Sequence, residues 1–579
     1  MNRQHPIYTE KNQCQDCCRC VRNCPVKAIR IENGSATVIP ELCIVCGHCV
    51  DICPVNAKRV RNDVGRVRSF LSGGDRVFVS LAPSYVSEFT EWSAAQLIAA
   101  LRQLGCEAVS ETALGAQQVS AAVSLALQSE TPRLLVSSAC PVVVDLIGRY
   151  MPDYAENVTQ LCSPLLAHCR MLRDTIGGDL RIVFIGPCIA KKREADQYPD
   201  LLDVAISFDD LRKWLAAEHI DPASITPGPD DRFVPEPAAE GALYPVDGGM
   251  IAGIKANCAV NDASFMAFSG VENVRRALAH LRDTPLNGPL FLEMLACEGG
   301  CVNGPLMHDR DATVRKRLDI IAGTDYPQDP FPRTPTVDAH LDRRAEAVEK
   351  PAFSEKQIRQ ALTQVGKYAV EDEMNCGGCG YHSCREFAEA LLQQKAEPTM
   401  CVSYMRKLAQ KKANALMQSM PSGVVIVQND LTVVECNRRL AEMLGPEILQ
   451  VYDAMPGLEG AALNRILPFM SRMFRRVLDT GSAVLDRDVS QAGRVYHVSI
   501  FTVERGRLVG GVIQDITEPA VQREQVIHRA QDVIRRQMET VQKIAYLLGE
   551  NAAESQVSLN SIIESFAPES LGDKGNADG

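Results

Sequence analysis

The sequence lacks an excess of basic residues. Its 61 lysines and arginines are outnumbered by 72 aspartates and glutamates, which gives a formal net charge of −11 at pH 7. Nucleic acids and anionic membranes are bound through basic faces, so this balance argues against both kinds of partner. We therefore expect no nucleic acid and no membrane among the partners of this chain.

Long hydrophobic runs are also missing. Residues 1–6 contain no apolar core of the signal-peptide kind, and the longer apolar runs are interrupted by proline or charge well short of a membrane span. These absences predict a soluble, cytoplasmic protein. At 579 residues the chain is too long for one ordinary hydrophobic core, so several domains are expected.

Cysteine, by contrast, is abundant, with 22 residues. In a small secreted domain such a number would indicate disulfides. Here the cysteines cluster at the spacings of metal ligands, in a large chain without a signal peptide. In a reducing compartment these clusters predict metal sites.

Residues 1–68 contain a repeated cysteine pattern. A C-x2-C-x2-C-x3-C-P run recurs 29 residues later, and this is the spacing of bacterial ferredoxins, in which the fourth cysteine of each run ligates the other of two [4Fe-4S] clusters. Cys18 lies outside the register and is interpreted as a bystander or a neighbour that tunes the potential. Zinc is the alternative metal. We expect electron transfer through two clusters, one held by Cys14, Cys17, Cys20 and Cys53 and the other by Cys24, Cys43, Cys46 and Cys49.

Residues 75–345 predict an α/β domain. Two short apolar runs, residues 77–84 and 181–188, end in loop residues and are typical of buried parallel strands. Helical patterns occur at residues 94–104 and 274–281. The whole chain is thus expected to be multidomain, α/β and α+β, with ligands at strand ends in this domain.

Three loops of this domain contain four further cysteines. They are residues 137–141, 186–194 and 293–301. In order and spacing they resemble the three cysteine motifs of the [FeFe]-hydrogenase catalytic domain. The resemblance implies that Cys140, Cys188, Cys297 and Cys301 bind a [4Fe-4S] cluster and that Cys301 bridges to a two-iron H-cluster subsite. Buried structural cysteines are the alternative.

The chain departs from that family where protons are handled. Ala139 replaces the family's proton-relay cysteine, and Ala122 and Val123 stand where catalytic members place paired glutamates. A positioned acid–base group contributes roughly 10²–10⁴-fold in rate, so turnover should be weak. These losses are typical of the sensory branch of the family. Two motif methionines and a lysine are also replaced, by Gly186, Leu295 and Cys162.

Lys191 and Glu194 match the second motif and are the catalytic residues that the resemblance implies. The family gives this lysine a hydrogen-bonding role near the cofactor. The adjacent Lys192 is the other candidate for that role. A surface salt bridge is the alternative interpretation of the pair.

Residues 350–405 contain a third cysteine pattern, C-x2-C-x4-C-x16-C. It resembles the four-cysteine cluster domain attached to several anaerobic redox proteins, with a helix at residues 385–394 between the third and fourth ligands. A third accessory [4Fe-4S] cluster is expected, and structural zinc is the alternative. His382 is interpreted as an exposed loop residue. The predicted ligands are Cys376, Cys379, Cys384 and Cys401.

Residues 409–517 alternate short strands and helices. Strand patterns at residues 422–427 and 431–437 precede a helix, and a strand pair at residues 496–503 and 508–513 leads to a closing Asp-x-Thr at residue 517. This order resembles a PAS domain, in which the closing side chains tie the last strand to the outgoing helix. Its ligand is unknown. His497 and Cys436 are candidate haem or redox ligands, although residues at such strand positions are more often ordinary core or surface residues.

Residues 518–567 contain apolar residues at a spacing of seven, namely Ile527, Ile534, Val541 and Leu548. This is the pattern of a coiled-coil seam. It predicts an amphipathic output helix that would join two protomers into a homodimer, and a helix folded back on the PAS sheet is the alternative. Residues 568–579 are polar and glycine-rich and are expected to be disordered.

The function predicted from the sequence is an iron–sulfur sensor of hydrogen or redox potential in an anaerobe. No kinase, phosphatase or DNA-binding pattern follows the output helix, so the signal is expected to pass to a separate signalling protein. The first alternative is an active but slow [FeFe]-hydrogenase with ferredoxin as its electron partner and Cys162 as a substitute proton donor. The second is an iron–sulfur assembly scaffold without the two-iron subsite.

Overall fold

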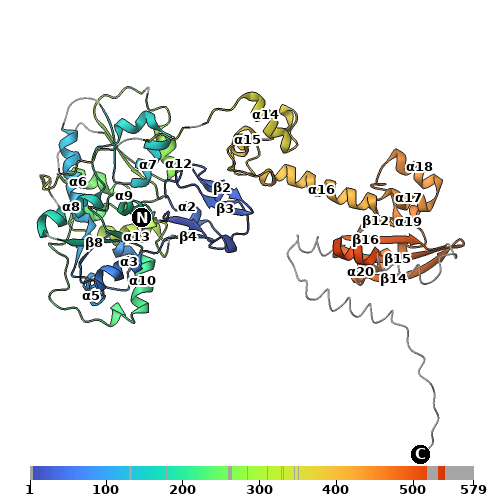
Figure 1. Cartoon of the computed structure of the whole chain (residues 1–579), viewed down its shortest axis with the longest axis horizontal. Helices are drawn as coiled ribbons and strands as arrows, with labels where there is room; N and C mark the ends of the chain where they lie inside the picture. The colour runs from blue at the N-terminus through green and yellow to red at the C-terminus, as the bar shows by residue number, and fades with distance from the viewer. Residues whose placement is uncertain are drawn as a thin grey trace, which may run out of the picture. The chain divides into compact units, whose positions relative to one another are not determined.

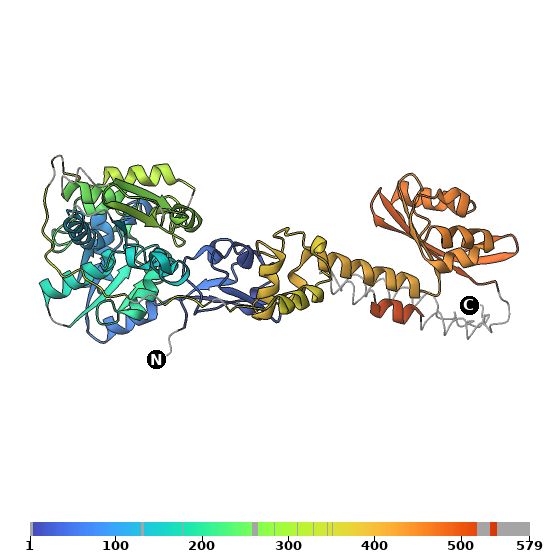
Figure 2. The same ribbon diagram turned by 90° about the horizontal axis from the view of Figure 1, so that it is seen from above.

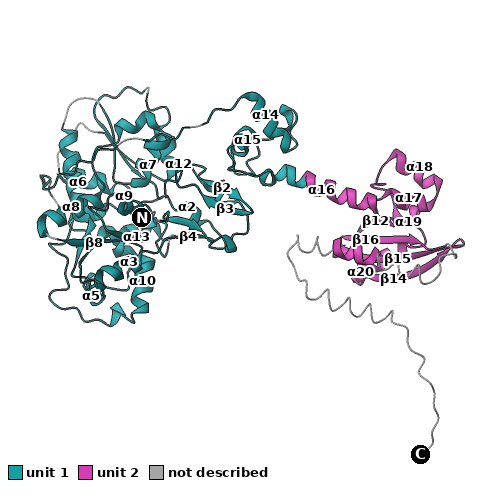
Figure 3. Cartoon of the chain, in the orientation of Figure 1, with its two compact units in different colours: residues 1–406 teal, residues 407–579 magenta. Residues whose placement is uncertain are grey.

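The computed structural model describes residues 4–128, 133–177, 179–257, 264–282, 284–309, 311–327, 329, 331–343, 346–349, 351–517 and 533–540. The chain divides into two compact units, residues 1–406 and 407–579 (Figure 3). None of the helices within these described ranges combines the length and the apolar character that crossing a bilayer requires. Figure 1 labels the elements along the chain.

Two antiparallel strand pairs frame the N-terminal segment. The strand β1 (Ile7–Thr9) pairs with β4 (Lys58–Val60), and β2 (Ile29–Glu32) pairs with β3 (Ser35–Val38). The short helices α1 (Arg19–Asn23) and α2 (His48–Asp51) occupy equivalent places in the two cysteine runs. Each follows a residue with positive φ, Cys18 at 55° and Gly47 at 82°. The repeated sequence pattern therefore produces a repeated local structure.

The α/β domain contains two parallel sheets. The first has the order β6 (Ala108–Glu111), β5 (Arg76–Leu81), β8 (Leu180–Ile185) and β9 (Val204–Ile206). The second has the order β10 (Ser264–Ser269), β11 (Leu290–Leu295) and β7 (Leu134–Val136). The two parallel strands predicted from the apolar runs are β5 and β8. Every residue of β5 except Arg76, and every residue of β8 except Arg181, is buried.

Helices connect and cover these strands, and two of them begin with a reciprocal cap. Ser93 and Ser207 each accept the backbone N–H three residues on, which satisfies a free donor at the helix start. The helices are α3 (Val64–Ser72), α4 (Tyr85–Glu88), α5 (Ala94–Gln103), α6 (Thr112–Leu127), α7 (Pro141–Tyr150), α8 (Pro164–Ile176), α9 (Ala190–Gln197), α10 (Phe208–Ala217), α11 (Gly249–Asn257), α12 (Val271–Leu278) and α13 (Thr313–Ala322), with 3₁₀ turns at Lys11–Gln13, Pro152–Asn157, Pro222–Ser224, Glu240–Leu243 and Cys301–Asn303.

The helix predicted at residues 274–281 is displaced. The observed α12 begins at Val271, directly after Gly270 with φ of 93°, and ends at Leu278. Ala279, the C-cap residue, has an extended backbone with φ of −60° and ψ of 128°, so the helix stops before it. The apolar pattern located the helix, but these two backbone conformations set its ends.

Three strands lead directly into the cysteine loops. Residues 137–141 follow β7, residues 186–194 follow β8 and residues 293–301 begin at the end of β11. Because these are the carboxyl ends of parallel strands, the two sheets direct all three loops toward one region.

A helical module follows at residues 351–406. The helices α14 (Glu355–Gln364) and α15 (Cys384–Leu392) pack against each other through a small apolar cluster. Short 3₁₀ turns occur at Val370–Asp372 and Pro398–Met400. The module packs on the N-terminal segment, whose Ile31 N–H donates to Lys395 O at 3.2 Å (Figure 2). The predicted helix at residues 385–394 corresponds to α15.

The second unit contains a five-stranded antiparallel sheet that begins after α16 (Val402–Ser419). Its order is β13 (Val433–Cys436), β12 (Gly423–Gln428), β16 (Leu508–Asp515), β15 (Arg494–Glu504) and β14 (Val484–Gln491). Its helices are α17 (Arg438–Leu444), α18 (Pro446–Ala454), α19 (Leu463–Ile466) and α20 (Ser471–Thr480). The closing Thr517 accepts the Val495 N–H through Oγ1 at 3.0 Å, which ties the end of β16 to β15.

Two parts of the sequence prediction for this unit need comment. The strand β14 is absent from the prediction, because its mostly exposed residues show little apolar alternation. The predicted output helix at residues 518–567 lies outside the described residues except for residues 533–540, which are helical, and the tail at residues 568–579 lies wholly outside them.

A buried histidine joins two strands of the first sheet to α8. The Nδ1 of His168 lies 2.8 Å from Ser80 Oγ, and its Nε2 lies 2.8 Å from Ser110 Oγ. Burial lowers the pKa of His168 to about 3. The neutral ring therefore stabilises the fold above its ordinary pKa of about 6.5, and this stabilisation is lost as the pH falls toward the lowered value.

We expect His168→Gln to flatten the pH dependence of stability. Each pH unit below about 6.5 should cost the wild type about 1.4 kcal/mol through this ring, or about 2 kcal/mol at pH 5, whereas glutamine does not titrate. Denaturant unfolding can be followed by tryptophan fluorescence, because the chain's two tryptophans, Trp92 and Trp214, both lie in the α/β domain. The exposed His382→Gln is the control, and equal slopes for His168→Gln and wild type would contradict this role.

Candidate functional site

Four cysteines from the three loops line one small cavity of about 20 Å³. They are Cys140, Cys188, Cys297 and Cys301. Cys140 is the N-cap residue of α7, and Cys301 opens a 3₁₀ turn after Gly300. Gly300 has φ of 96°, and a Cβ there would lie 2.3 Å from the carbonyl oxygen of Pro245. Only glycine therefore allows the chain to bring Cys301 to the cavity.

The four cysteines of this cavity are half-buried. Burial raises the pKa of Cys188 to about 11 and also raises the pKa of Cys140 and Cys301. A thiol that coordinates a metal is deprotonated outright, so the raised pKa values describe the cost of forming thiolates here, which a bound metal would have to offset. The ammonium group of Lys191 opposes that cost and lowers the pKa of all three cysteines.

Lys191 is held by a buried ion pair. Its Nζ lies 2.6 Å from Glu194 Oε2, which also accepts a hydrogen bond from Ser163 Oγ at 3.1 Å. Burial disfavours the charge on Lys191, but Glu194 and Cys188 outweigh this effect and raise its pKa. Because both side chains are almost fully buried, the alternative of a surface salt bridge is wrong.

Lys192 faces away from the cysteine cavity. Its Nζ donates to Ala205 O at 3.0 Å and lies 3.4 Å from both Asp63 and Asp210. Of the two adjacent lysines, Lys191 is thus the one whose charge acts on the cysteines of the cavity, and its role near a cofactor stays a prediction.

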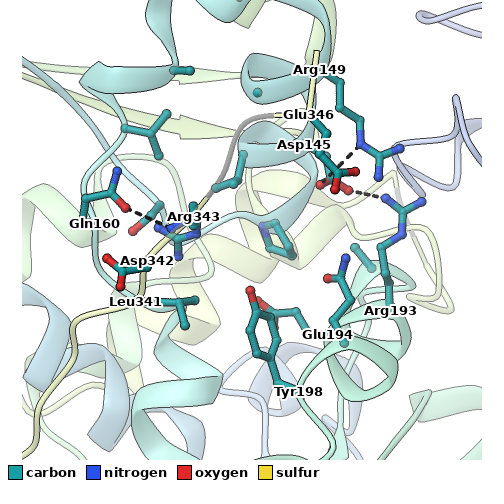
Figure 4. Close-up of a pocket in the computed structure, with 18 of the residues that line it drawn as sticks. Asp145, Arg149, Gln160, Arg193, Glu194, Tyr198, Leu341, Asp342, Arg343 and Glu346 are labelled. Atoms are coloured by element: carbon teal, nitrogen blue, oxygen red, sulfur yellow. Dashed lines mark hydrogen bonds and ion pairs between the residues drawn. The ribbon is translucent and has the colours of Figure 1, made fainter. Parts of the chain in front are cut away.

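Glu194 also lines a separate polar cavity of about 560 Å³ (Figure 4). Figure 4 shows Arg193 and Arg149 directed at Asp145 and Arg343 beside Gln160. Arg193 also donates to the backbone carbonyl of Cys43, 150 residues away. The Lys191–Glu194 pair thus lies between a polar cavity and the cysteine cavity.

Four cysteines of the N-terminal segment line a second small apolar cavity of about 20 Å³. They are Cys24, Cys43, Cys46 and Cys49, the second predicted set. The Ala28 N–H donates to Cys24 Sγ and the Val45 N–H to Cys43 Sγ, both at 3.3 Å. Backbone donors of this kind support iron–sulfur ligation by stabilising charge on sulfur.

The two cavities share a wall. Cys46 lines both of them, and Val45 lines the cavity of Cys140. Gly47, with φ of 82°, permits this approach, since a Cβ there would lie 2.6 Å from Pro305 and 2.9 Å from Ile189. The N-terminal segment is therefore packed directly against the loop that follows Cys301.

The first predicted set is partly assembled. Cys14 and Cys17 act electrostatically on Cys20, whose pKa burial raises to about 11, so these three thiols lie near one another. Cys53 accepts the Ala57 N–H at 3.2 Å. Cys18 lies beside this group. Its thiol donates to Asp16 O at 3.6 Å, and its pKa is raised to about 12, chiefly by burial, with Cys20 among the charges that contribute.

Lys58 is a functional candidate that the sequence analysis missed. This buried side chain donates to Thr9 Oγ1 and Ala36 O, each at 2.6 Å. Its charge lowers the pKa of three cysteines drawn from both N-terminal sets, namely Cys14, Cys20 and Cys49. No spacing rule could have found it, because the contact depends on pairing β4 with the rest of the segment.

The third predicted set is divided between two environments. Cys376 and Cys401 act electrostatically on Cys379, which also accepts the Tyr381 N–H. Cys384 begins α15 and packs with Ile358 and Leu362. Cys376, Cys379 and Cys401 thus lie near one another, and Cys384 lies in the α14–α15 contact.

The positions expected to handle protons are apolar or blocked. Ala139 is half-buried and its N–H donates to Ser137 Oγ at 3.2 Å. Val123 is fully buried in the core of the α/β domain. Cys162 is also fully buried, burial raises its pKa to about 11, and it does not line the cysteine cavity. None of these side chains offers a proton at the cavity.

The candidate PAS ligands differ in accessibility. His497 is partly exposed and its Nδ1 lies 2.7 Å from Asp488 Oδ1. Cys436 is buried, and burial raises its pKa to about 12. His382 is exposed, as predicted for a loop residue.

The donor sets fit iron–sulfur clusters in their chemistry. Thiolates are their ligands, and two of the sets line apolar cavities supplied with backbone N–H donors or a buried cation. Among the described residues, no three cysteine, histidine or acidic side chains are arranged to hold a single metal ion.

Four family models match parts of this chain. Residues 75–305 match the model "Iron only hydrogenase large subunit, C-terminal domain", and residues 36–59 match "4Fe-4S binding domain". Residues 372–403 match "Putative Fe-S cluster" and residues 412–479 match "PAS domain". The chain is a hydrogenase-like iron–sulfur protein with a PAS domain.

Individual relatives are distant. The chain is 24% identical over 323 residues to iron hydrogenase 1 of Clostridium pasteurianum, covering 46% of this chain and 56% of that protein. It thus spans little more than half the length of the curated relative that it matches. The solved apo [FeFe]-hydrogenase HydA1 of Chlamydomonas reinhardtii is 18% identical, with a TM-score of 0.36, covering 48% of this chain and 91% of that one. A solved domain of an HTR-like protein from Haloarcula marismortui is 20% identical, with a TM-score of 0.14. The match covers 17% of this chain and 100% of that one.

We expect Cys24→Ala and Cys18→Ala to have opposite outcomes, although both thiols are buried in the same segment. Cys24 lines the second cavity, so its loss should lower the iron content by about four atoms per chain. Cys18 should be dispensable. Iron and sulfide analysis of anaerobically purified protein checks this, and full iron in Cys24→Ala or an equal loss in Cys18→Ala would refute the assignment.

Proposed function

We propose that this hydrogenase-like iron–sulfur protein is a sensor of hydrogen or of redox potential. The observation that carries the proposal is the combination of an intact four-cysteine cavity with Ala139 in place of a proton-carrying side chain. A site that binds but turns over slowly suits detection better than metabolism, because its occupancy can follow the surroundings.

Cys140, Cys188, Cys297 and Cys301 would hold a [4Fe-4S] cluster, with Cys301 also bridging to a two-iron subsite. Three accessory [4Fe-4S] clusters would be held by the two N-terminal sets and by the Cys376 set. When bound, these groups supply hydrogen oxidation and one-electron storage. Cys46 lines two adjacent cavities, which supports electron transfer between the site of Cys140 and the N-terminal site to which Cys46 itself belongs.

The residues around the cavity favour retention of a proton over its transfer. Lys191 has a raised pKa and is locked to Glu194, so it keeps its proton and its position. Ala139 carries no exchangeable side-chain proton. Val123 on α6 is apolar, at a position where catalytic members of the resembling family place a glutamate. Since a missing acid–base group costs roughly 10²–10⁴-fold in rate, slow turnover follows.

The PAS domain and the output helix supply the proposed relay. Two protomers would associate through these parts, and the signal would pass to a separate cytoplasmic signalling protein, with ferredoxin as a candidate electron partner. A coupling of roughly 1–3 kcal/mol between the sites would be enough to bias such a partner.

The first test is anaerobic infrared spectroscopy of the maturated protein with and without hydrogen. The two-iron unit implied by the family resemblance carries carbonyl and cyanide ligands, so bands that shift with hydrogen are expected, together with slow gas turnover. Turnover at the rates of metabolic hydrogenases would refute the sensor proposal. Absence of the bands would indicate a cubane alone, as in a scaffold.

We expect Ala139→Cys to raise hydrogen turnover. A restored acid–base group is worth roughly 10²–10⁴-fold, and with Ala122 and Val123 unchanged we expect the lower end of this range. Gas exchange at matched iron content measures the effect, with Ala139→Ser as the control of similar size. If Ala139→Cys is no faster than Ala139→Ser, the missing relay is not what limits turnover.

A further inference from the structure

Lys58 carries a buried positive charge in the N-terminal segment. The residue is 3% exposed, and its Nζ donates to Thr9 Oγ1 and to Ala36 O, each at 2.6 Å. Both acceptors are neutral, and none of the carboxylates within the described ranges forms an ion pair with this ammonium group. Lys191 and Lys192, the buried lysines of α9, differ because each has a carboxylate within 3.4 Å. Since a buried charge is costly unless it is paired, Lys58 needs an anionic partner of another kind.

The residues around this ammonium group contact two thiols of the first predicted set. Ala36, whose carbonyl accepts from Lys58, donates its own N–H to Cys14 Sγ at 3.5 Å. Ala57, the residue before Lys58, donates its N–H to Cys53 Sγ at 3.2 Å. Lys58 is therefore separated by a single residue from two thiols of one set, along two independent series of hydrogen bonds.

The position of the charge is fixed by three strands. Lys58 on β4 lies opposite Thr9 on β1, and Thr9 Oγ1 donates to Ala36 O of β3 at 2.6 Å. The ammonium group, the hydroxyl and the carbonyl thus form a closed set of hydrogen bonds. The Glu10 N–H also donates to Ala57 O at 2.8 Å, which holds the start of β4 in place. A charge held in this way does not move away when the charge beside it changes.

We propose that the ammonium group of Lys58 is the counter-charge of the iron–sulfur cluster held by Cys14, Cys17, Cys20 and Cys53, and that it raises the reduction potential of this cluster. Reduction adds one negative charge to a cluster, so a fixed cation nearby stabilises the reduced state more than the oxidised one. The low dielectric of the surrounding core keeps this effect from being screened. The inference rests on the proposed function in so far as the first set holds a cluster.

The test compares Lys58→Gln with Arg59→Gln. Both changes remove one positive charge from β4, but Arg59 is exposed, so water and salt screen its charge. Lys58→Arg retains a charge at the buried position. Redox titration of the full-length, cluster-loaded protein, followed by electron paramagnetic resonance, gives the midpoint potentials. Cys17→Ala and Cys24→Ala variants identify the signals of the first and second N-terminal sites.

We expect Lys58→Gln to make reduction of the first N-terminal site about tenfold less favourable, a shift of about 59 mV to more negative potential for one electron. Because the glutamine amide can still donate a hydrogen bond, this shift reports the loss of charge. Arg59→Gln should match wild type, and Lys58→Arg should stay close to it. The shift should persist in about 1 M salt, since salt screens exposed charges far more than buried ones.

Iron content separates this role from simple packing. Loss of iron from the first site in Lys58→Gln, with Lys58→Arg fully loaded, would also support a counter-charge. Loss in both Lys58 variants would overturn the proposal, as would an unchanged potential in Lys58→Gln, an equal shift in Arg59→Gln or a first site without iron in the wild type. Because the titration needs neither hydrogen nor the two-iron unit, its outcome is separable from that of the infrared test.

Discussion

The shared apolar core of the first unit is the constraint on which its cysteine sites depend. Buried residues of the N-terminal segment, of β11 and α7, and of the four-cysteine module belong to one continuous cluster. The cysteines Cys20, Cys24, Cys43 and Cys401 are buried in it, and Cys140, Cys188 and Cys379 pack against it. Each such side chain leaves water only because segments far apart in the sequence close over it, so the sites form together with the core.

A low-dielectric core makes every charge within it consequential. The cationic groups next to the thiols are few and individually anchored. Lys58 is held by Thr9 and a backbone carbonyl, Lys191 by Glu194, and Lys27 by carbonyls of α1. A fixed ammonium group compensates thiolate charge without the reorganisation that a mobile side chain would need, which is the kind of control that sets cluster potentials.

Local patterns in the sequence predicted much of this architecture. The cysteine spacings located sets that the structure gathers around two cavities, and the apolar runs located β5 and β8. What they could not locate depends on contacts between distant segments. Arg193 reaches the carbonyl of Cys43, Lys58 acts on two cysteine sets, and Tyr381 contacts the N-terminal segment. The polar edge strand β14 was not predicted for a different reason. Its residues are mostly exposed, so the sequence shows no alternation of apolar and polar residues there.

The contact of Gly47 with Pro305 and Ile189 also bears on the order in which the molecule is completed. Val45 and Cys46 form part of the wall of the Cys140 cavity, although they belong to the first 68 residues of the chain. The loop after Cys301 is synthesised some 250 residues later, so this cavity stays open on one side until both pieces have folded and met. The cavity therefore takes its final shape only when the N-terminal segment packs against this loop.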